Sequence, residues 1–355
     1  MKSHAKLSAL FTPTMIKRLA MVFLALIVLV TSVGATYEMS ARAQTARDFP
    51  PPGKLVDIGG RRIQLDCRGT GSPTVIFESG LDMRGSLSWS TVQDEIAKTT
   101  RACAYSRAGI MWSDPSVAHQ NGKSVAIDLH ATLNKAGEQG PFVLVGHSLG
   151  GPYIMTYTKY FGQDVAGLVF VDASHPEQVQ RFEAIAKSPG SELSGIMDRM
   201  GAALAWTGVA RAYIALTNDD TLESPSVPDS VKRAERSYVP TSLSAYIREE
   251  DSLDETLAEA GSFRKLGSRP LFVLTATAPL PKQSLDSLGI TPDQGAKFQK
   301  TWEQMHDDQA TWSSQSQHQL IPDSGHGIQF DRPDIVIAAV RSVIEKVHAK
   351  QNRNN

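Results

Sequence analysis

Short apolar runs alternate with longer stretches of helical periodicity along most of the chain. The runs are rich in β-branched and aromatic residues, which favour strands. Strands that alternate with helices are typical of βαβ units and a mostly parallel sheet. The predicted strands begin with a hairpin that turns at Gly59–Gly60 and continue with "TVIFESG", "RACAYSR", "FVLVGHS", "GLVFVDA", "PLFVLTA" and "HQLIPDS".

The alternation of strands and helices stops after Ala173. The long stretch that follows has the pattern of helices, with a break at "ESPSVPDS". A helical insert late in such a sheet can form a lid over the carboxyl ends of the strands, where open sheets bind ligands. We therefore expect a core made of residues 54–175 and 269–350, with a helical cap at residues 176–268. The last amphipathic pattern, "PDIVIAAVRSVIEKVHAK", predicts a closing helix.

A basic and then strongly apolar segment opens the chain. The basic residues before "LAMVFLALIVLV" are Lys2, Lys6, Lys17 and Arg18. This order is typical of an export signal, and "VGA" and "ARA" fit the small-residue cleavage pattern. The apolar stretch is also close to the length of a membrane span. Residues 1–46 are therefore predicted to be a signal peptide or an uncleaved signal anchor. A proline-rich linker at residues 47–53 follows, and the domain is expected outside the cytoplasm, periplasmic or extracellular.

Charge and composition narrow the classes of partner. Acidic and basic residues balance, and the 355 residues carry a formal net charge of −1. Nucleic-acid-binding proteins usually carry a basic surface, so no nucleic-acid partner is expected. Neither a CxxC motif nor a His/Cys cluster occurs, so we predict no metal site.

A serine among glycines follows one of the predicted strands. Gly146, Ser148 and Gly150 form the pattern G-x-S-x-G between "FVLV" and the helical pattern "GPYIMTYTKYFG". In a nucleophile elbow the serine occupies a strained turn, and only small neighbours let the strand and the helix pack so closely. The hydroxyl is then exposed at the start of the helix. We therefore predict that Ser148 is a nucleophile.

The chain resembles the α/β-hydrolase superfamily, in the branch of bacterial hydrolases that carry "ESGL", "CAYxRAG", "GHSLGG" and "SGH". The resemblance covers nearly everything from Lys54 to about His348 and is weakest across the helical insert. It implies an α/β fold with a mostly parallel eight-stranded sheet flanked by helices and a helical cap inserted after strand six. It implies no metal or organic cofactor.

The resemblance also implies the order Ser…Asp/Glu…His for a catalytic triad. His326, in "DSGHGIQF", follows the last predicted strand between two glycines, which suits a loop that presents an imidazole as general base. The commonest position of the acid, just after "PLFVLTA", has no carboxylate before Asp286. Asp172 ends "GLVFVDA" at the superfamily's alternative acid position. Asp172 is therefore the preferred acid, with Asp286 as the alternative.

A tetrahedral intermediate also needs donors for its oxyanion, usually two backbone N–H groups. One is predicted to be Leu149, the residue after the nucleophile. The resemblance points to Leu81, in "ESGLD", for the other, where Gly80 lets the backbone approach.

The two cysteines lie on different predicted strands. Cys67 is on the second strand and Cys103 on the fourth, and the superfamily's sheet order places these strands side by side. In an oxidising compartment such cysteines form a disulfide if their Cα atoms lie within about 7 Å. We predict a Cys67–Cys103 disulfide, with two buried thiols as the alternative.

These features together predict a serine hydrolase that cleaves a small-molecule carboxylic ester, or another acyl substrate, through an acyl-enzyme. An amidase, peptidase or lipase would use the same triad, and a non-catalytic ligand-binding protein could have the same fold. An aspartate nucleophile, as in dehalogenases and epoxide hydrolases, is excluded by Ser148 itself. Met197, Trp206 and Tyr213 in the helical insert are candidates for an acyl pocket or for plain core. The N-terminal apolar segment adds an expected association with a membrane.

Overall fold

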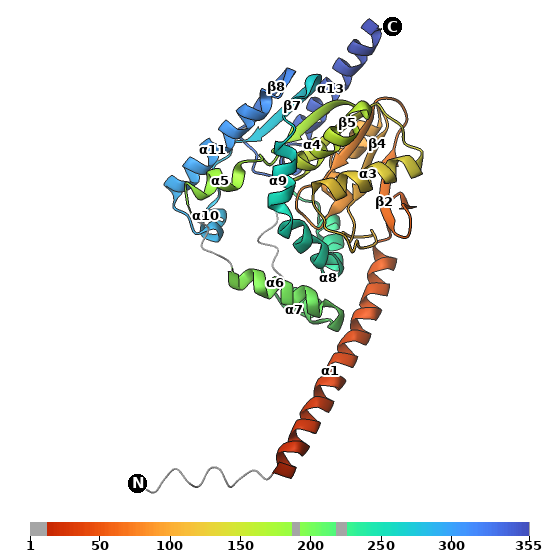
Figure 1. Cartoon of the computed structure of the whole chain (residues 1–355), viewed down its shortest axis with the longest axis vertical. Coiled ribbons are helices and arrows are strands. Elements are labelled where there is room, and N and C mark those ends of the chain that lie inside the picture. The colour runs from red at the N-terminus through yellow and green to blue at the C-terminus, as the bar shows by residue number, and fades with distance from the viewer. Residues whose placement is uncertain (1–12, 187–191, 218–225, 355) are drawn as a thin grey trace.

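An eight-stranded sheet forms the centre of the protein in a computed structural model that describes residues 13–186, 192–217 and 226–354 (Figure 1). The strand order is β1-β2-β4-β3-β5-β6-β7-β8. β2 pairs antiparallel with β1 and β4, and the other pairings are parallel, so the predicted mostly parallel sheet is confirmed. The strands are β1 (Lys54–Asp57), β2 (Arg62–Arg68), β3 (Thr74–Glu78), β4 (Ala102–Ser106), β5 (Phe142–His147), β6 (Val165–Val171), β7 (Gly267–Ala276) and β8 (Ser313–Ile321).

Helices cover both faces of the sheet, which is why its central strands read as continuous apolar runs. On one face, Leu144 of β5 belongs to a buried cluster with residues of α3 (Gly122–Ala136) and α4 (Gly150–Phe161). On the other face, Val143 and Val145 of the same strand belong to a cluster with α2 (Gln93–Ala97) and α13 (Pro333–Asn354). Successive side chains of a strand point to opposite faces, so β5 is buried along its whole length.

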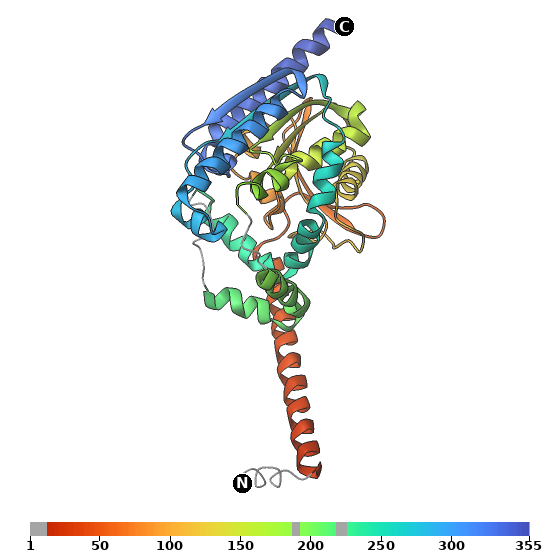
Figure 2. The same cartoon turned by 60° about the vertical axis from the view of Figure 1, so that its left-hand side comes forward.

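The segment between β6 and β7 is helical, as the sequence predicts. Its elements are α5 (Gln178–Glu183), α6 (Glu192–Leu204), the 3₁₀ turn η3 (Ala205–Thr207), α7 (Val209–Thr217), α8 (Asp229–Asp251) and α9 (Leu253–Gly261). The predicted break at "ESPSVPDS" lies partly outside the described residues. α9 packs on α3 and α4, whereas α6 and α7 lie on the side of the domain from which α1 (Pro13–Asp48) projects (Figures 1 and 2).

Helices also fill the connections elsewhere in the chain. They are η1 (Gly85–Trp89), η2 (Gly162–Asp164), α10 (Lys282–Leu288), α11 (Pro292–Ala310) and α12 (Ile328–Asp331). The sequence pattern described above predicts no helix between β7 and β8, where α10 and α11 lie. A capping box at Thr291 and Gln294 starts α11, with Pro292 at its first position. Both features favour a helix at that point.

The N-terminal helix α1 has two parts with different surroundings. The most apolar stretch of α1 is 0% buried in the protein. Among the described residues, α1 is the one helix that is long and apolar enough to cross a membrane, judged by length and composition. The end of α1 instead packs on the inserted helices, where buried Glu38 forms an ion pair with Arg211 of α7. The helix continues to Asp48, so it includes the first residues of the predicted linker. Lys2 and Lys6 of the basic segment lie outside the described residues.

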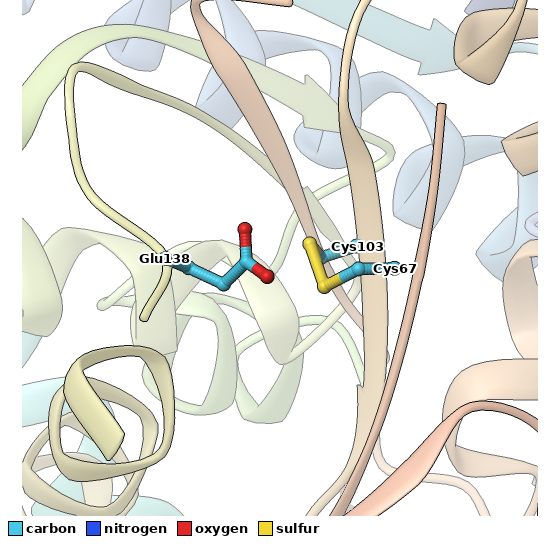
Figure 3. Close-up of side chains that lie close together, drawn as sticks. All are labelled: Cys67, Cys103 and Glu138. Carbon is cyan, nitrogen blue, oxygen red and sulfur yellow. A yellow bond between two sulfur atoms is a disulfide. The ribbon is translucent and has the colours of Figure 1, made fainter. Parts of the chain in front are cut away.

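The predicted disulfide joins β2 to β4. Cys67 and Cys103 lie directly opposite each other in the antiparallel pairing, with their Cα atoms 4.0 Å apart, and their sulfurs are bonded. Figure 3 shows Glu138 beside this bond, and these three residues are the one set of candidate metal ligands found among the described residues. Because each sulfur is bonded to the other and Glu138 forms an ion pair with Arg101, the group is a cross-link beside a salt bridge.

Candidate active site

Ser148 lies in a tight turn between β5 and α4. Its φ angle is 53°, in the left-handed region that non-glycine residues rarely adopt, and such strain is typical of functional positions. A Cβ atom on Gly146 would lie 2.5 Å from the carbonyl oxygen of Gly150, and one on Gly150 would lie 2.5 Å from that of Glu78. Both contacts are far too short for a side chain. Gly146 is therefore needed for β5 and α4 to approach each other, and Gly150 for α4 to approach the end of β3.

Asp172 and His326 form the next part of the site. Asp172 follows β6 with a φ of 44°, and His326 lies in the loop after β8. The His326 Nδ1–H group donates to Oδ2 of Asp172 at 2.6 Å. The other carboxylate oxygen, Oδ1, accepts hydrogen bonds from the backbone N–H of Ala276 and from Nε1 of Trp302, both at 2.9 Å. All these groups converge at the carboxyl ends of β6 and β7.

The protonation of this pair follows from its contacts. Burial of Asp172 would raise the pKa of its carboxyl group, but the hydrogen bond from His326 and the nearby His326 and His306 rings outweigh burial and lower that pKa. Asp172 is therefore a carboxylate at neutral pH. Because Nδ1 of His326 donates to this carboxylate, Nε2 is the acceptor nitrogen of the neutral ring. The His326 side chain is 55% exposed.

Backbone contacts hold the three residues in one place. The carbonyl oxygen of Ser148 accepts the N–H of Ser174, two residues after Asp172, at 2.8 Å. Nε2 of His147, the residue before Ser148, donates to the carbonyl oxygen of His326 at 2.9 Å. Burial lowers the pKa of His147 to about 3, so its ring is neutral and positions the loop of His326 without adding charge.

The alternative acid and the other histidines have different partners. Asp286 is exposed on α10 and pairs with Lys282. His306 is fully buried on α11 and contacts the carbonyl oxygen of Ala173 and the hydroxyl of Thr275. Burial lowers the pKa of His306 to about 4, so this ring is neutral. Among these candidates, Asp172 is the carboxylate that contacts His326.

The loop after β3 lies against the serine turn. A Cβ atom on Gly80 would lie 2.9 Å from Cβ of Ser148, so the backbone at residue 80 runs directly beside the serine. The next residue, Leu81, belongs to the same apolar cluster as Leu149 and Tyr153. The two backbone segments predicted to supply oxyanion donors are therefore neighbours on one side of Ser148.

A buried charge network centred on Arg107, which the sequence alone does not indicate, holds this loop. The Arg107 guanidinium donates to Glu78 at 2.8 Å and to both carboxylate oxygens of Glu249, at 2.8 and 2.7 Å. It also donates to the carbonyl oxygens of Ser79, at 2.8 Å, and Gly80, at 2.6 Å. Because Glu249 lies on α8, this one guanidinium connects the inserted helices to the loop beside Ser148.

The carboxylates of Glu78 and Glu249 both pair with Arg107, and all three side chains are buried. Burial raises the pKa of Glu78 to about 7, against the opposing effect of Arg107, and burial also raises the pKa of Glu249. Glu78 and Arg107 occur in the "ESGL" and "CAYxRAG" motifs, so their place in these motifs was the one indication in the sequence that they have a role. Their contact with α8 depends on how the inserted helices pack, so the sequence could not reveal it.

One face of α11 forms a second supporting contact that sequence reasoning missed. Trp302, His306 and Gln309 are spaced i, i+4 and i+7, and each bonds to the chain just after β6: to Asp172, to the carbonyl oxygen of Ala173, and to those of Ala173 and Ser174. Residues at this spacing share one helix face. The spacing was visible in the sequence, but nothing there showed that this face meets the end of β6.

Comparisons with known proteins agree with this architecture. A thermophilic esterase from Thermogutta terrifontis has a TM-score of 0.57 and 18% identity, covering 83% of this chain and 98% of the esterase. A variant of a Pseudomonas aeruginosa protein provisionally named an epoxide hydrolase also has a TM-score of 0.57, with 16% identity and coverage of 85% and 98%. At such identities the likeness concerns the fold.

The first curated sequence relatives match this chain over only part of their own length. A Hormonema carpetanum protein named "Probable transporter efuK" is 25% identical over 319 residues, which are 84% of this chain and 43% of that protein. The chain thus spans about half the length of the first curated relatives it matches, or less. Residues 34–339 match the alpha/beta hydrolase family over most of the chain. With the sheet order and the serine turn described above, this match shows that the chain belongs to the alpha/beta hydrolase family.

Proposed function

We propose that the protein is a serine hydrolase that cleaves carboxylic esters through an acyl-enzyme. The observation that carries the proposal is the contact of His326 with the Asp172 carboxylate, beside the strained turn of Ser148. In this mechanism Nε2 of His326 takes the hydroxyl proton of Ser148 as the oxygen attacks the ester carbonyl. Asp172 stabilises the imidazolium that forms. The same proton then passes to the leaving alkoxide.

The second half of the reaction uses the same groups. Water attacks the acyl-enzyme while His326 accepts its proton, and Ser148 leaves as the alcohol when that proton is returned. The N–H groups of Leu81 and Leu149 stabilise the oxyanion in both steps. The close approach of Gly80 to Ser148 supports this role, since it brings both backbone segments to one side of the serine.

The helical segment between β6 and β7 is the proposed cap of the site, and α1 is the proposed anchor. Nineteen uncharged residues, 19–37, separate Arg18 from Glu38, and at 1.5 Å per residue they extend about 28 Å, close to the hydrocarbon thickness of a bilayer. The packing of Gly34 and Glu38 on the inserted helices favours an anchor that is retained over a signal that is removed. The catalytic domain would then lie outside the cytoplasm.

Labelling by a fluorophosphonate tests the nucleophile. The full chain in mild detergent is treated with the probe, and the labelled peptide is identified by mass spectrometry. We expect the label on Ser148, with labelling and ester hydrolysis both abolished in Ser148→Ala. Folded protein that binds esters without labelling or turnover would instead support the ligand-binding alternative.

Matched ester and amide substrates test the bond that is cleaved. Amidases, peptidases and lipases use the same triad, so the leaving group and the acyl chain must be varied separately. We expect turnover of the ester and much slower turnover of the amide with the same acyl group. Equal turnover of the two would favour the amidase or peptidase alternative.

A further inference from the structure

The helices α6 and α7 expose an apolar surface. Met197 and Met200 lie on one face of α6, with spacing i and i+3, and Val209, Tyr213 and Leu216 lie on one face of α7, with spacing i, i+4 and i+7. These five side chains, with Trp206 in the turn between the helices, are between 52% and 84% exposed. We call this set of six the hairpin surface. Sequence reasoning offered three of its members as acyl pocket or core, and the exposed fractions exclude the core role.

Large apolar side chains that are exposed together on neighbouring helices usually mark a surface that another phase or molecule covers. Tryptophan, tyrosine and methionine are large side chains whose exposure to water is unfavourable. The hairpin surface therefore needs an occupant, and the elements packed beside it indicate which one.

The hairpin is attached to α1 at the end of its uncharged segment. A Cβ atom on Gly34 would lie 2.1 Å from the carbonyl oxygen of Thr207, so the two backbones are in direct contact. One turn later, Glu38 is 1% exposed and forms ion pairs with Arg211 of α7 and with Arg42. Figures 1 and 2 both show α7 beside α1, with the bulk of the domain on the far side from the apolar part of that helix.

The attachment fixes the height of the hairpin relative to a bilayer. If residues 19–37 cross the hydrocarbon, Gly34 and Tyr37 lie in the last turn before the headgroups. The hairpin surface then lies at the same level, and Trp206 and Tyr213 occupy the interfacial zone in which such side chains are enriched. An amphipathic element in this zone inserts its apolar face about 5–10 Å into the boundary of headgroups and acyl chains.

We propose that the α6–α7 hairpin lies in the interface of the bilayer that α1 crosses, and that the enzyme takes a long-chain ester from that bilayer. The second part rests on the proposed ester hydrolysis at Ser148. The hairpin belongs to the segment that connects Asp172 at the end of β6 with β7, and α8 of the same segment contacts the loop beside Ser148 through Glu249 and Arg107. The helices proposed to meet the membrane therefore belong to the same inserted segment as α8, which contacts the loop beside Ser148.

Fluorescence in vesicles tests the first part without reference to activity. The full chain is reconstituted into vesicles of phosphatidylcholine and phosphatidylglycerol, with a single cysteine introduced by Leu216→Cys or Val209→Cys and labelled with a nitrobenzoxadiazole dye. The native cysteines are joined in a disulfide and do not react. Val117→Cys is the matched control, because Val117 is fully exposed in a loop of the core.

We expect blue-shifted emission from the two hairpin probes and quenching by phospholipids that carry a nitroxide close to the headgroup. The probe at position 117 should be quenched by aqueous iodide alone. Hairpin probes that behave like the control would overturn the membrane contact. Blue-shifted probes that no nitroxide lipid quenches, in protein that cross-links to a second copy, would overturn it in favour of a dimer interface.

Kinetics test the second part. The variant Met200→Gln/Val209→Gln/Leu216→Gln is compared with the native chain on a short water-soluble ester and on a long-chain ester presented in the same vesicles. We expect the short ester to be cleaved at a rate within about twofold of native, and the vesicle-borne ester about tenfold more slowly, because interfacial binding scales with the apolar area inserted. Rates that change equally on both esters would overturn the substrate source. Absence of turnover on either ester by the native chain would contradict the proposed function and leave the fluorescence result standing.

Discussion

Nδ1 of His326 lies 2.6 Å from Oδ2 of Asp172, although 154 positions separate these residues in the chain. The carboxylate cannot turn freely, because its other oxygen accepts hydrogen bonds from the backbone of Ala276 and from the indole of Trp302. The strands β6 and β7 and the helix α11 therefore orient Asp172, and Asp172 in turn fixes which nitrogen of His326 is free to accept a proton.

Replacement of Asp172 by Asn should preserve the fold and remove most of the activity. The amide can still accept the bonds from Ala276 and Trp302, but it cannot stabilise the imidazolium or enforce the same tautomer. We expect kcat for ester hydrolysis to fall by about 10²–10⁴, with little change in the thermal unfolding midpoint. Asp286→Asn is the control and should keep kcat within about twofold of native, since it removes an exposed ion pair. A larger loss in the Asp286 variant than in the Asp172 variant would reverse the assignment of the acid.

Replacement of Gly80 by Ala should reduce catalysis more than stability. The added methyl group would lie 2.9 Å from Cβ of Ser148, so the loop must move and the proposed N–H donor at Leu81 moves with it. Loss of one oxyanion donor costs about 10²–10³ in kcat. Steady-state kinetics on an activated ester measure the change. Gly195→Ala on α6 is the control, because its Cβ would meet only ordinary contacts, and native kinetics are expected from it.

Replacement of Arg107 by Met should strongly destabilise the domain. The substitution leaves Glu78 and Glu249 buried without their cation, and breaking a buried ion pair in this way costs about 3–5 kcal/mol. Urea unfolding of the detergent-solubilised chain measures the loss. Arg199→Met breaks an exposed pair with Asp251 and should cost at most about 1 kcal/mol. If Arg107→Met lowered the free energy of unfolding by no more than Arg199→Met does, the buried network would not contribute to stability as predicted.

Glu78 should make the stability depend on pH. Its folded pKa of about 7 lies above the ordinary value of 4.5, so the folded chain holds this proton more tightly than the unfolded chain. The stabilising contribution is therefore complete below about pH 4.5 and is lost as the pH rises toward and through 7. Glu78→Gln keeps a neutral side chain at every pH. Unfolding midpoints at pH 5 and pH 8 should show the variant gaining stability relative to native as the pH rises, and a gain in the opposite direction would contradict the raised pKa.

Removal of the disulfide should weaken the fold without altering the chemistry. The bond closes a loop with a sequence separation of 36 between Cys67 and Cys103, for which the chain-entropy relation predicts about 3–4 kcal/mol. We expect Cys67→Ser/Cys103→Ser to unfold at a lower urea concentration and to retain near-native kcat below its transition. An unchanged midpoint would contradict this prediction and mean that the bond does not restrict the unfolded chain as the chain-entropy relation requires.

Much of the fold was readable in the order of apolar runs. Strands buried on both faces, such as β5, must be continuous apolar segments, and the glycines around Ser148 are required by the close packing of β5, α4 and the loop after β3. These constraints act between residues that are close in the chain, so they produce recognisable patterns of residue types at fixed spacing. The disulfide prediction had a different basis, because it rested on the resemblance to the α/β-hydrolase superfamily, whose sheet order places β2 beside β4.

The partners of the candidate site were decided by tertiary structure. Two acids were compatible with the order of residues, and only the approach of the loop after β8 to the end of β6 brings His326 to Asp172. The pairing of Glu249 with Arg107 also depends on tertiary structure, because it requires α8 to pack beside the loop after β3. The amino-acid sequence determined the strands, the serine turn and the apolar N-terminal helix, because each depends on neighbours along the chain. The contact of Asp172 with His326, the buried charge network around Arg107 and the attachment of the hairpin to α1 all depend on contacts between distant segments. The spacing of residues along the chain does not reveal such contacts.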